Sequence, residues 1–559
     1  MKTTFAFFLS TCLAGAAFAG NGRLAKELES LDPASNVDVI VQFKQAPTEA
    51  HHQKVRARGG LHKKSLDLVK GSLYSVPAGR LKELADDPDV VNISPDRPLQ
   101  GVLDNAAPAV LGDIAQKYGW DGTGIGVAVL DSGMKDIADL QSKNGTGSRI
   151  VYAENFVPNS SPPDNYGHGT HVAGIIAGNG ASSTGSAYKV TLRGIAPNAN
   201  LINLRVLDSN GAGADSYVIA AIQRAIQLKS QYNIRVMNLS LGRPVAGSYK
   251  TDPLCQAVEA AWKAGIVVVV AAGNAGRDNS QSTYGYGTIT APGNDPYAIT
   301  VGAMKTLGTP SRSDDLIASY SSKGPTLLDH IAKPDIVAPG NRMVSGSTTG
   351  MNLVKQYPAN RIDDSYYMTN VTGRSFDYFT LSGTSMATPM VSGAAALLLQ
   401  QNPNLTPDLV KARLMKTAYK NFPFFSTATD PVTGATYTST YDLFTVGAGY
   451  LDIWAALNNS DTLPAGTTAL SPAVVYDPVW HLVSLVNGSS LAWGTSLAWG
   501  TNVVWGTNVV WGTNIVWGFN VVWGTSGMQG FNVVWGTNVV WGTGQPAGES
   551  TAIAINGEN

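Results

Sequence analysis

The chain has 559 residues, which is enough for several domains. It carries 39 Lys and Arg against 40 Asp and Glu, and this balance argues against nucleic acid as the main partner. Charged residues make up only 14% and there are 60 glycines, a composition that indicates a loop-rich, well-buried extracellular protein and not a disordered one.

Residues 1–19 have the pattern of a secretory signal peptide. Lys2 gives a positive start, residues 5–18 are mostly apolar, and the Ala-Phe-Ala at 17–19 fits the small-x-small cleavage pattern. The apolar run is too short, and too near the start, to favour a permanent membrane anchor. We therefore expect cleavage before Gly20 and a secreted or cell-surface protein, which sequencing of the mature N-terminus would test.

The two cysteines are Cys12 and Cys255. Because Cys12 leaves with the predicted signal peptide, the exported chain has one thiol and no internal disulfide. No neighbour of Cys255 is of a kind that would lower the pKa of its thiol, so we predict a small core residue there. Core burial must then supply most of the stability.

Residues 20–105 predict a small α+β domain of strand–helix–strand–helix–strand type. The end of this unit and the residues just after it, at 96–107, are polar and contain proline, which favours an exposed linker and cleavage region. The expected elements are a strand at 37–43, a helix at 51–70, a strand at 73–76, a helix at 80–85 and a strand at 90–93.

Residues 106–458 form a large unit in which apolar strands alternate with helices. Near-continuous apolar strands are typical of a parallel sheet with helices on both faces. Ligand sites in such folds lie at the carboxyl ends of the strands, where Asp131, Ser240 and Asn274 fall. The expected strands are at 126–130, 201–207, 236–240 and 266–272, and the expected helices at 172–177, 216–228 and 252–264.

Residues 459–559 contain a linker and a repeat tail. The commonest repeat unit is Trp-Gly-Thr-Asn-Val-Val, and no charged residue occurs from 478 to 548. Val-Val-Trp favours strand and Gly-Thr-Asn favours turn, so we expect a small β-solenoid or a stacked β-array. The functional alternative is an aromatic surface that binds the cell envelope, a glycan, another partner or a second copy of itself. The tryptophans recur at 493, 499, 505, 511, 517, 523, 535 and 541.

Ser385 lies at the N-terminal end of a predicted buried helix. The small-residue turn 382–384 precedes it and the apolar run 391–399 follows. Backbone N–H groups and the helix dipole at such a position can stabilise an oxyanion formed when the hydroxyl attacks a carbonyl. A serine before an apolar helix is, however, far more often a helix cap. The rest of the chain must therefore supply a base, an orienting carboxylate and a second oxyanion donor.

Candidates for the base are few, because the chain has only seven histidines. Those of the large unit are His168, His171 and His330. Glycines flank His168 and leave its imidazole open to a cleft, whereas His171, one helical turn further on, is expected to pack inward. A metal site formed by His168 and His171 lacks an evident third ligand, so we favour His168 as a base.

Asp131 and Asn274 complete the set. Asp131 ends a buried strand, where a hydrogen bond to an imidazole would satisfy its charge and fix the tautomer. Asn274 ends the most apolar strand, and its side-chain amide can be the second oxyanion donor. Each residue also fits an ordinary turn position. All four segments together, in the order Asp, His, Asn, Ser on an α/β frame, are hard to produce by chance.

Four segments closely resemble the signature segments of the subtilisin-like serine proteases, and the order of the catalytic residues matches that family too. The resemblance covers about 108–458 and implies a parallel sheet of the seven-stranded type flanked by helices. It also implies that residues 20–105 are an inhibitor-like propeptide, which occupies the substrate site until autocleavage. The four segments are Val-Leu-Asp-Ser-Gly at 129–133, Gly-His-Gly-Thr-His-Val-Ala-Gly at 167–174, Ala-Ala-Gly-Asn at 271–274 and Gly-Thr-Ser-Met-Ala-Thr-Pro at 383–389.

The resemblance assigns a role to each catalytic residue. Ser385 would be the nucleophile, His168 would take its proton and return it to the leaving amine, and Asp131 would hold the imidazolium. Asn274 and the backbone N–H of Ser385 would bind the oxyanion. No cofactor would be required for the chemistry.

The resemblance also extends to substrate and metal binding. Ser240, Leu241 and Gly242 resemble the segment that pairs with the extended substrate and lines the primary pocket. The segments that form this pocket carry no evident charge, which favours an apolar or permissive P1 residue over a basic one. Asp139, followed by Leu140, matches one calcium-ligand position of the family, so a structural calcium ion is compatible with the sequence while its ligand set is unknown.

The leading hypothesis is a secreted endopeptidase of broad specificity that acts on proteins or peptides. A second hypothesis is a specific processing protease whose tail selects the target or the location. A third is a surface-binding protein that keeps an idle protease domain, against which all four catalytic positions speak. Casein hydrolysis, with Ser385→Ala as the control, distinguishes these classes.

Overall fold

The structure, a computed structural model, divides into two units, Met1–Leu99 and Gln100–Asn559. The predicted signal peptide lies outside the described residues, and the predicted domain boundaries at 105 and 458 stay predictions. The described residues are 23–25, 28, 31–66, 70–95, 103–142, 147–160, 163–280, 282–430, 433–463, 467–477, 482–486, 503–505, 509–511 and 557–558.

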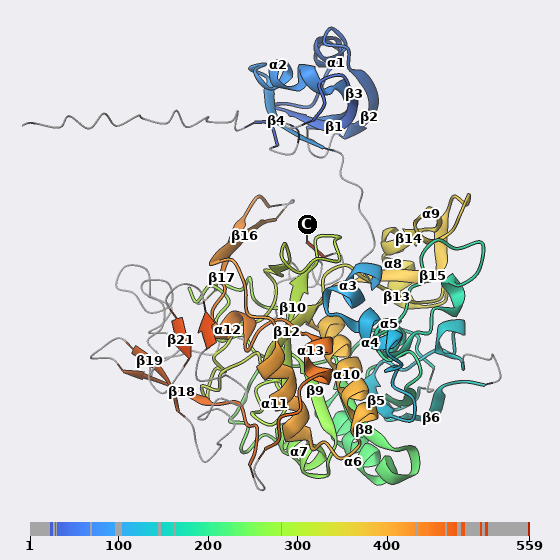
Figure 1. The fold of residues 1–559 in the computed structure, drawn as a ribbon, viewed down its shortest axis with the longest axis vertical. Helices are drawn as coiled ribbons and strands as arrows, with labels where there is room; N and C mark the ends of the chain where they lie inside the picture. Colours follow the sequence, from blue (N-terminus) through green and yellow to red (C-terminus); the bar gives the residue numbers. More distant parts are fainter. Residues whose placement is uncertain are drawn as a thin grey trace, which may run out of the picture. The chain divides into compact units, whose positions relative to one another are not determined.

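The first unit is a four-stranded antiparallel sheet in the order β2-β3-β1-β4 with two helices (Figure 1). Alternate residues of β1 are buried, and they pack with Val55 of α1 and with Leu81 and Leu84 of α2. One apolar face of the sheet thus carries the core. The elements are β1 (Asn36–Phe43), α1 (Glu49–Arg56), β2 (Leu61–Leu66), β3 (Gly71–Pro77), α2 (Leu81–Ala85) and β4 (Val90–Pro95), with a 3-10 turn η3 (Ala78–Arg80).

The helix predicted at 51–70 is wrong in its second half. α1 ends at Arg56, and residues 61–66 form β2, which pairs with β3. Gly59, at φ 79°, turns the chain, and a Cβ on Gly60 would lie 2.5 Å from Val55 Cγ1. The two glycines therefore stop the helix and let the chain return as an edge strand.

The second unit is built on an eight-stranded sheet in the order β11-β10-β9-β8-β5-β7-β6, with β12 paired to β10. Every strand pairs in parallel except β11, which is antiparallel to β10. The strands are β5 (Gly126–Asp131), β6 (Ile150–Asn155), β7 (Asn200–Arg205), β8 (Ile234–Leu239), β9 (Val267–Ala271), β10 (Ile299–Lys305), β11 (Leu316–Ile317) and β12 (Ile336–Pro339). The strands and helices predicted for this unit are confirmed, with small shifts of their ends.

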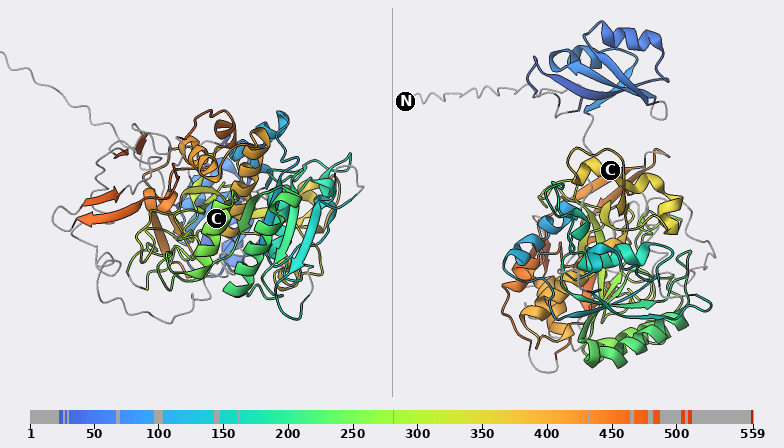
Figure 2. Two further views of the ribbon diagram at one scale, coloured as in Figure 1. Left: turned by 90° about the horizontal axis from the view of Figure 1, so that it is seen from below. Right: turned by 90° about the vertical axis from the view of Figure 1, so that its right-hand side faces the viewer.

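Helices cover both faces of this sheet (Figure 2). After β5 the chain runs to the edge strand β6 and returns through α5 (His168–Ala177) to β7, whereas α6 (Asp215–Tyr232) and α7 (Pro253–Lys263) lead on to β8 and β9. α5 packs with α10, whereas α6 packs with α7, so the helices form two separate groups. The chain leaves β5 towards one end of the sheet and leaves its neighbour β8 towards the other, and the carboxyl ends at such a reversal are the usual place for a ligand site.

α10 (Thr384–Gln401) is the central helix of the second unit. It packs against α5 and against β8, β9 and β10, and most of its residues are fully buried. A helix that is apolar all round belongs in a core, which explains the run of Ala and Leu. The further helices are α3 (Leu103–Ala109), α4 (Gly112–Lys117), α8 (Asn352–Gln356), α9 (Asp364–Tyr367), α11 (Pro407–Thr417), α12 (Leu443–Val446) and α13 (Ile453–Leu457), with 3-10 turns η4 (Ala138–Leu140), η5 (Ala181–Ser183) and η6 (Pro358–Asn360).

Smaller sheets lie outside the main one. Two Val-Val-Trp units of the repeat tail are strands that pair antiparallel, whereas a parallel β-helix stacks its turns in parallel, and the predicted fold of the tail stays a prediction. The other repeats lie outside the described residues. The strands are β13 (Met343–Gly346), β15 (Arg374–Leu381) and β14 (Arg361–Asp363) in that order, and the hairpins β16 (Phe425–Thr429) with β17 (Thr436–Thr440), β18 (Ala473–Asp477) with β19 (Leu482–Val486), and β20 (Val503–Trp505) with β21 (Val509–Trp511).

Two properties of the described residues bear on the predictions for the membrane and the thiol. None of their helices combines the length and the apolarity that crossing a bilayer requires. Cys255 is fully buried in α7, as predicted, and burial raises the pKa of its thiol. A thiol in this setting is a core group and not a nucleophile.

Candidate active site

Three strand ends and two helix starts carry the candidate residues. β5 ends at Asp131, β8 leads into Ser240 and β9 leads towards Asn274, and these three strands are neighbours in the sheet. α5 begins at His168, and α10 begins one residue before Ser385. The parallel order puts the three strand ends on one edge of the sheet.

Asp131 and His168 form a direct hydrogen bond. His168 Nδ1 lies 2.7 Å from Asp131 Oδ1, which also accepts the backbone N–H of Ser132 at 2.7 Å. The carboxylate is 1% exposed, and its Oδ2 has no partner among the described residues. Because the carboxylate is an acceptor only, Nδ1 of a neutral imidazole carries the proton and Nε2 is left as the basic nitrogen.

The surroundings of His168 act on its basicity in two directions. Burial alone would lower the pKa of the imidazole, but the charge of Asp131, its hydrogen bond and the more distant charge of Asp164 together raise the pKa above the ordinary value of 6.5. The imidazolium is therefore stabilised where it forms, as a general base requires.

Asp164 is a buried residue of the site that the sequence analysis missed. Its Oδ1 accepts the Ser132 hydroxyl at 3.0 Å and the Gly167 N–H at 2.7 Å, and its Oδ2 accepts the Thr170 N–H and hydroxyl at 2.9 and 2.7 Å. It thereby joins the segment after Asp131 to the first turn of α5. The only local signal is its place shortly before a glycine-flanked helix start, which is typical of a capping aspartate.

The Ser385 hydroxyl donates to the backbone oxygen of Ser240 at 3.1 Å. In return, the Ser240 hydroxyl donates to the backbone oxygen of Ser385 at 2.8 Å and accepts from Asn238 Nδ2 at 3.0 Å. Within the described part of the chain, the structure therefore joins Ser385 to Ser240 and not to His168. Catalytic hydrogen bonds are often absent or poorly aligned before substrate binds.

Asn274 is held by the residue before the candidate nucleophile. Its Oδ1 accepts the Thr384 N–H at 2.8 Å and the Thr384 hydroxyl at 3.1 Å. These bonds use the oxygen of the amide and leave its Nδ2 group as a donor. Gly383, at φ 142°, passes close to that group: a Cβ there would lie 3.3 Å from Nδ2. A side chain at 383 would crowd the donor, so glycine is needed for approach as well as for backbone conformation.

His171 does not belong to the site. It is fully buried in α5, and its Nε2 lies 3.0 and 3.1 Å from the backbone oxygens of Met343 and Phe379. Two carbonyl acceptors require an N–H at Nε2, and burial lowers the pKa of the ring to about 3. His171 is thus the inward-packed neutral histidine that was predicted, although its Nδ1 finds no partner among the described residues.

The segment 240–242 leaves the sheet with free backbone groups. Leu241 and Gly242 form no backbone–backbone hydrogen bond with described residues, whereas Arg243, the next residue, pairs with Ala291 at 2.9 and 2.8 Å. Backbone groups of this kind can pair with an extended peptide by strand addition. A Cβ on Gly242 would lie 2.5 Å from Thr290 Oγ1, so this place requires glycine.

The predicted calcium position at Asp139 does not fit a metal ion. Its carboxylate accepts the Ser182 N–H at 2.7 Å and the Tyr378 hydroxyl at 2.8 Å. The Arg149 guanidinium donates to the backbone oxygens of Asp139, Gln141, Ala177 and Ala199. Backbone oxygens are a usual kind of calcium ligand, and here a guanidinium already binds them. No group of three or more His, Cys, Asp or Glu in the described ranges is arranged to hold a metal.

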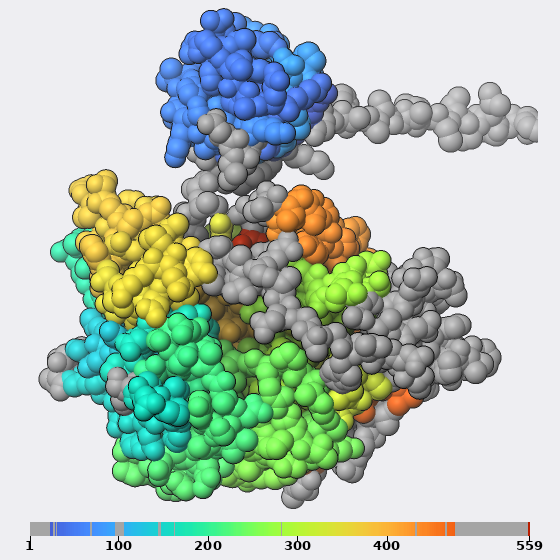
Figure 3. Space-filling model, turned by 180° about the vertical axis from the view of Figure 1, so that it is seen from behind, coloured from blue at the N-terminus to red at the C-terminus, as the bar shows by residue number. Residues whose placement is uncertain are grey.

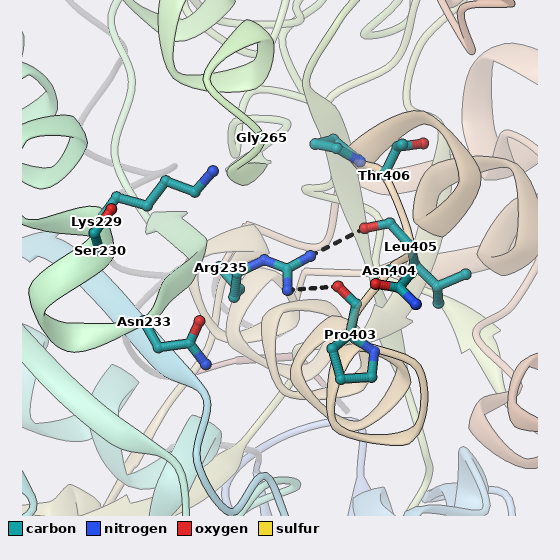
Figure 4. Close-up of a pocket in the computed structure, with 10 residues that line it drawn as sticks. Lys229, Ser230, Asn233, Arg235, Gly265, Pro403, Asn404, Leu405 and Thr406 are labelled. Atoms are coloured by element: carbon teal, nitrogen blue, oxygen red, sulfur yellow. Dashed lines mark hydrogen bonds between the residues drawn. The ribbon is translucent and has the colours of Figure 1, made fainter. Parts of the chain in front are cut away.

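The pocket drawn in Figure 4 lies at the opposite edge of the sheet. It is bounded by the amino ends of β8 and β9 and by the segment 403–407. Its central side chain, Arg235, donates to the backbone oxygens of Pro403 and Leu405 at 2.8 and 3.0 Å. A guanidinium used in this way joins loops, and the pocket holds none of the candidate residues.

The chain is similar in sequence to several known proteins. The model of the subtilase family matches residues 122–449. The serine protease AprX of Bacillus subtilis (strain 168) is 36% identical over 399 residues, which cover 69% of this chain and 83% of that protein. Subtilisin E of the same organism is 32% identical over 394 residues, covering 68% and 84%. A cold adapted subtilisin-like serine proteinase of known crystal structure is 30% identical, with a TM-score of 0.38 over 54% of this chain and 85% of that one.

The family match spans the strands and helices that carry Asp131, His168, Asn274 and Ser385. The sequence resemblance, the parallel sheet with helices on both faces and the relatives agree. The chain belongs to the subtilase family and is a subtilisin-like serine endopeptidase.

Proposed function

We propose that this endopeptidase cuts peptide bonds through an acyl-enzyme on Ser385, with His168 as the base and Asp131 as its orienting carboxylate. The observation that carries the proposal is the 2.7 Å bond between His168 Nδ1 and the buried Asp131 at the reversal point of the sheet. Hydrolysis of casein by the purified mature chain tests the activity. A fluorophosphonate label traced to a single peptide tests the nucleophile.

In the first step, the Ser385 hydroxyl turns from the Ser240 carbonyl to Nε2 of His168 and attacks the substrate carbonyl. His168 accepts the proton, and the buried charge of Asp131 stabilises the imidazolium that results. The existing bond of the hydroxyl to Ser240, at 3.1 Å, is an ordinary hydrogen bond, so the change of partner costs little.

The oxyanion of the tetrahedral intermediate is proposed to lie between Asn274 Nδ2 and the backbone N–H of Ser385. The start of α10 adds the positive end of a helix dipole. The intermediate then expels the amine, to which His168 returns the proton. Water repeats the sequence on the ester: His168 takes its proton, the second oxyanion forms, and His168 returns the proton to the Ser385 oxygen as the acid product leaves.

Asn274→Ala is expected to lower kcat by about 100-fold or more with little change in KM, because the donor acts on the oxyanion and not on the ground state. Steady-state kinetics with a peptide amide measures this. Thr384→Val is the matched comparison: it removes one of the two bonds that hold Asn274 but keeps the Nδ2 donor. A larger loss in Thr384→Val than in Asn274→Ala would contradict the assignment.

The chain is proposed to prefer apolar or varied P1 residues over basic ones. Leu241 of the substrate segment, and Thr290 and Ala291 beside Gly242, carry no charge. A basic P1 side chain would find no carboxylate there to pair with. A peptide library with a varied P1 position tests the preference.

Secretion and zymogen activation are also proposed. The signal-like residues 1–19 support export, and the separate four-stranded unit supports a propeptide that blocks the substrate site until it is cut off. The proposed chemistry uses only groups of the chain, so it needs no cofactor. A precursor with Ser385→Ala should stay uncut, whereas the parent should lose its first unit.

The repeat tail is proposed to bind a glycan, the cell envelope or a second copy of itself. A tryptophan at every sixth position and the lack of charge support a surface for such a partner. Deleting the tail would show whether location or activity depends on it.

A further inference from the structure

Glu558 is a buried acidic residue that lies beyond the repeat tail. Only 6% of it is exposed. Its Oε2 lies 2.7 Å from an Arg277 guanidinium nitrogen, and its Oε1 accepts the Ser319 N–H at 2.7 Å and lies 3.4 Å from Lys305 Nζ. The Ser319 hydroxyl also donates to the carboxylate. Two cations and two hydrogen bonds thus surround one carboxylate.

The backbone beside this carboxylate is bound as well. The Glu558 N–H donates to Asn341 Oδ1 at 2.9 Å, and Asn341 Nδ2 donates to the Glu558 carbonyl at 2.7 Å. Gly557 has φ 75°, and a Cβ on it would lie 2.5 Å from Ser382 Oγ and 2.7 Å from Arg342 Cγ. The site therefore fits a Gly-Glu pair in three ways: through backbone hydrogen bonds, through the limited space around the glycine, and through the charge of the glutamate.

The residues around Glu558 require an acid. The side chains of Arg277 and Lys305 are 8% and 4% exposed, and Asp430, 5% exposed, binds the other end of Arg277 at 2.8 Å. The Tyr437 ring lies 4.5 Å from the same guanidinium. Buried cations are costly unless acids balance them, and Glu558 supplies the second acid. The contacts come from the loops after β9, β11 and β12 and from the end of β10, so the pocket is formed by residues 106–458 of the second unit, which are called the peptidase unit below. Figure 3 shows the dark red C-terminal atoms in a hollow beside the orange β16–β17 hairpin.

The segment before the repeats is attached to the same unit. Ser471 donates its hydroxyl to Asp335 at 2.5 Å, accepts from Lys411 Nζ at 2.9 Å, and its N–H donates to Pro296 at 2.9 Å. Ala473 then forms a bridge with Ile331. Residues on both sides of the repeats therefore contact the peptidase unit.

We propose that Arg277, Lys305, Ser319 and Asn341 form a docking pocket for a Gly-Glu peptide segment, and that its occupant is Gly557–Glu558 of the same chain. Docking holds the repeat-bearing segment to the peptidase unit at both ends. A cut within the repeats then leaves the distal part bound. The occupied pocket also borders Ser382, three residues before Ser385.

The test uses the full chain carrying Ser385→Ala, which prevents self-digestion. Residues 525–528, where the repeat is interrupted, are replaced by the recognition sequence of a specific protease. After cutting, gel filtration should find the distal fragment with the peptidase unit. Glu558→Gln should weaken retention by about 30-fold or more, because one partner of a buried charged cluster is lost. Glu549→Gln makes the same charge change nearby and should retain the fragment.

Gly557→Val provides a second variant, since it keeps the carboxylate but cannot fit beside Ser382; it should also release the fragment. A free peptide of residues 551–559 should displace the parent fragment, and the same peptide with Glu558→Gln should not. Release of the parent fragment on cutting would overturn the proposal. Equal retention of the parent and Glu558→Gln fragments would overturn it too, because the repeats would then hold the fragment.

Discussion

Replacing Ser385 with alanine is expected to lower kcat for peptide hydrolysis by about 10⁶-fold, the loss known for the corresponding change in subtilisin, to which this chain is related. The physical reason is that the hydroxyl proposed to form the acyl-enzyme is removed. His168 and the oxyanion donors remain, but they can only assist direct attack by water. The residual rate should therefore stay above that of uncatalysed hydrolysis.

The measurement is initial-rate hydrolysis of a peptide amide, with active sites titrated by a fluorophosphonate. Ser385→Ala should bind substrate with little change in affinity and take up no label. Ser311→Ala, on the exposed surface of the same unit, removes a serine hydroxyl without touching the site and should keep full activity and labelling. A Ser385→Ala protein that is still labelled at one site would show that the nucleophile is another residue.

The same measurements distinguish an active subtilase from a protein whose protease unit is catalytically inactive. If the parent chain neither hydrolyses casein nor takes up the label, its fold serves another purpose despite the pairing of Asp131 with His168. The structure argues otherwise because a buried, partly unpaired carboxylate is retained at that place. Keeping such a group costs stability, which is typical of a functional site.

The sequence predicted the large unit well because its signals are local. Apolar strands such as 267–271 and the buried helix after Ser385 need no distant partner to be recognised. The helix predicted at 51–70 failed because polar, basic spacing fits a helix and an exposed edge strand equally. Only the glycine pair at 59 and 60 marks the break, and pairing with β3 decides the outcome.

The candidate residues could be proposed from the sequence because each follows a strand or starts a helix within a distinctive segment. Asp164 could not be proposed, because its role depends on tertiary contacts. It links Ser132 to Thr170, and no local sequence pattern reveals this link. The pocket around Glu558 is even harder to predict from the sequence. Its arginine, lysine and asparagine stand far apart in the chain, and each alone is an ordinary polar residue.

Asp131→Asn is the second large effect, with an expected loss of about 10⁴-fold in kcat. The amide can hold the ring, but it no longer selects the tautomer with the proton on Nδ1, and it offers no charge to the imidazolium. The new amide N–H group would also lie near a buried position that has no partner among the described residues, so some loss of stability is expected. Circular dichroism and the thermal midpoint would separate that loss from the kinetic one.

The pH dependence of kcat/KM tests the role of Asp131 more directly than the loss of kcat does. The base must be neutral to act, so kcat/KM of the parent falls as the pH drops through the pKa of His168. Because the charge of Asp131 raises that pKa against the effect of burial, the parent should lose activity at a pH above 6.5. In Asp131→Asn the main raising effect is gone and burial remains, so the acidic limb should move to lower pH. An unchanged limb would mean that Asp131 does not act on the base, whereas a shifted limb with a normal fold ties the carboxylate to His168 directly.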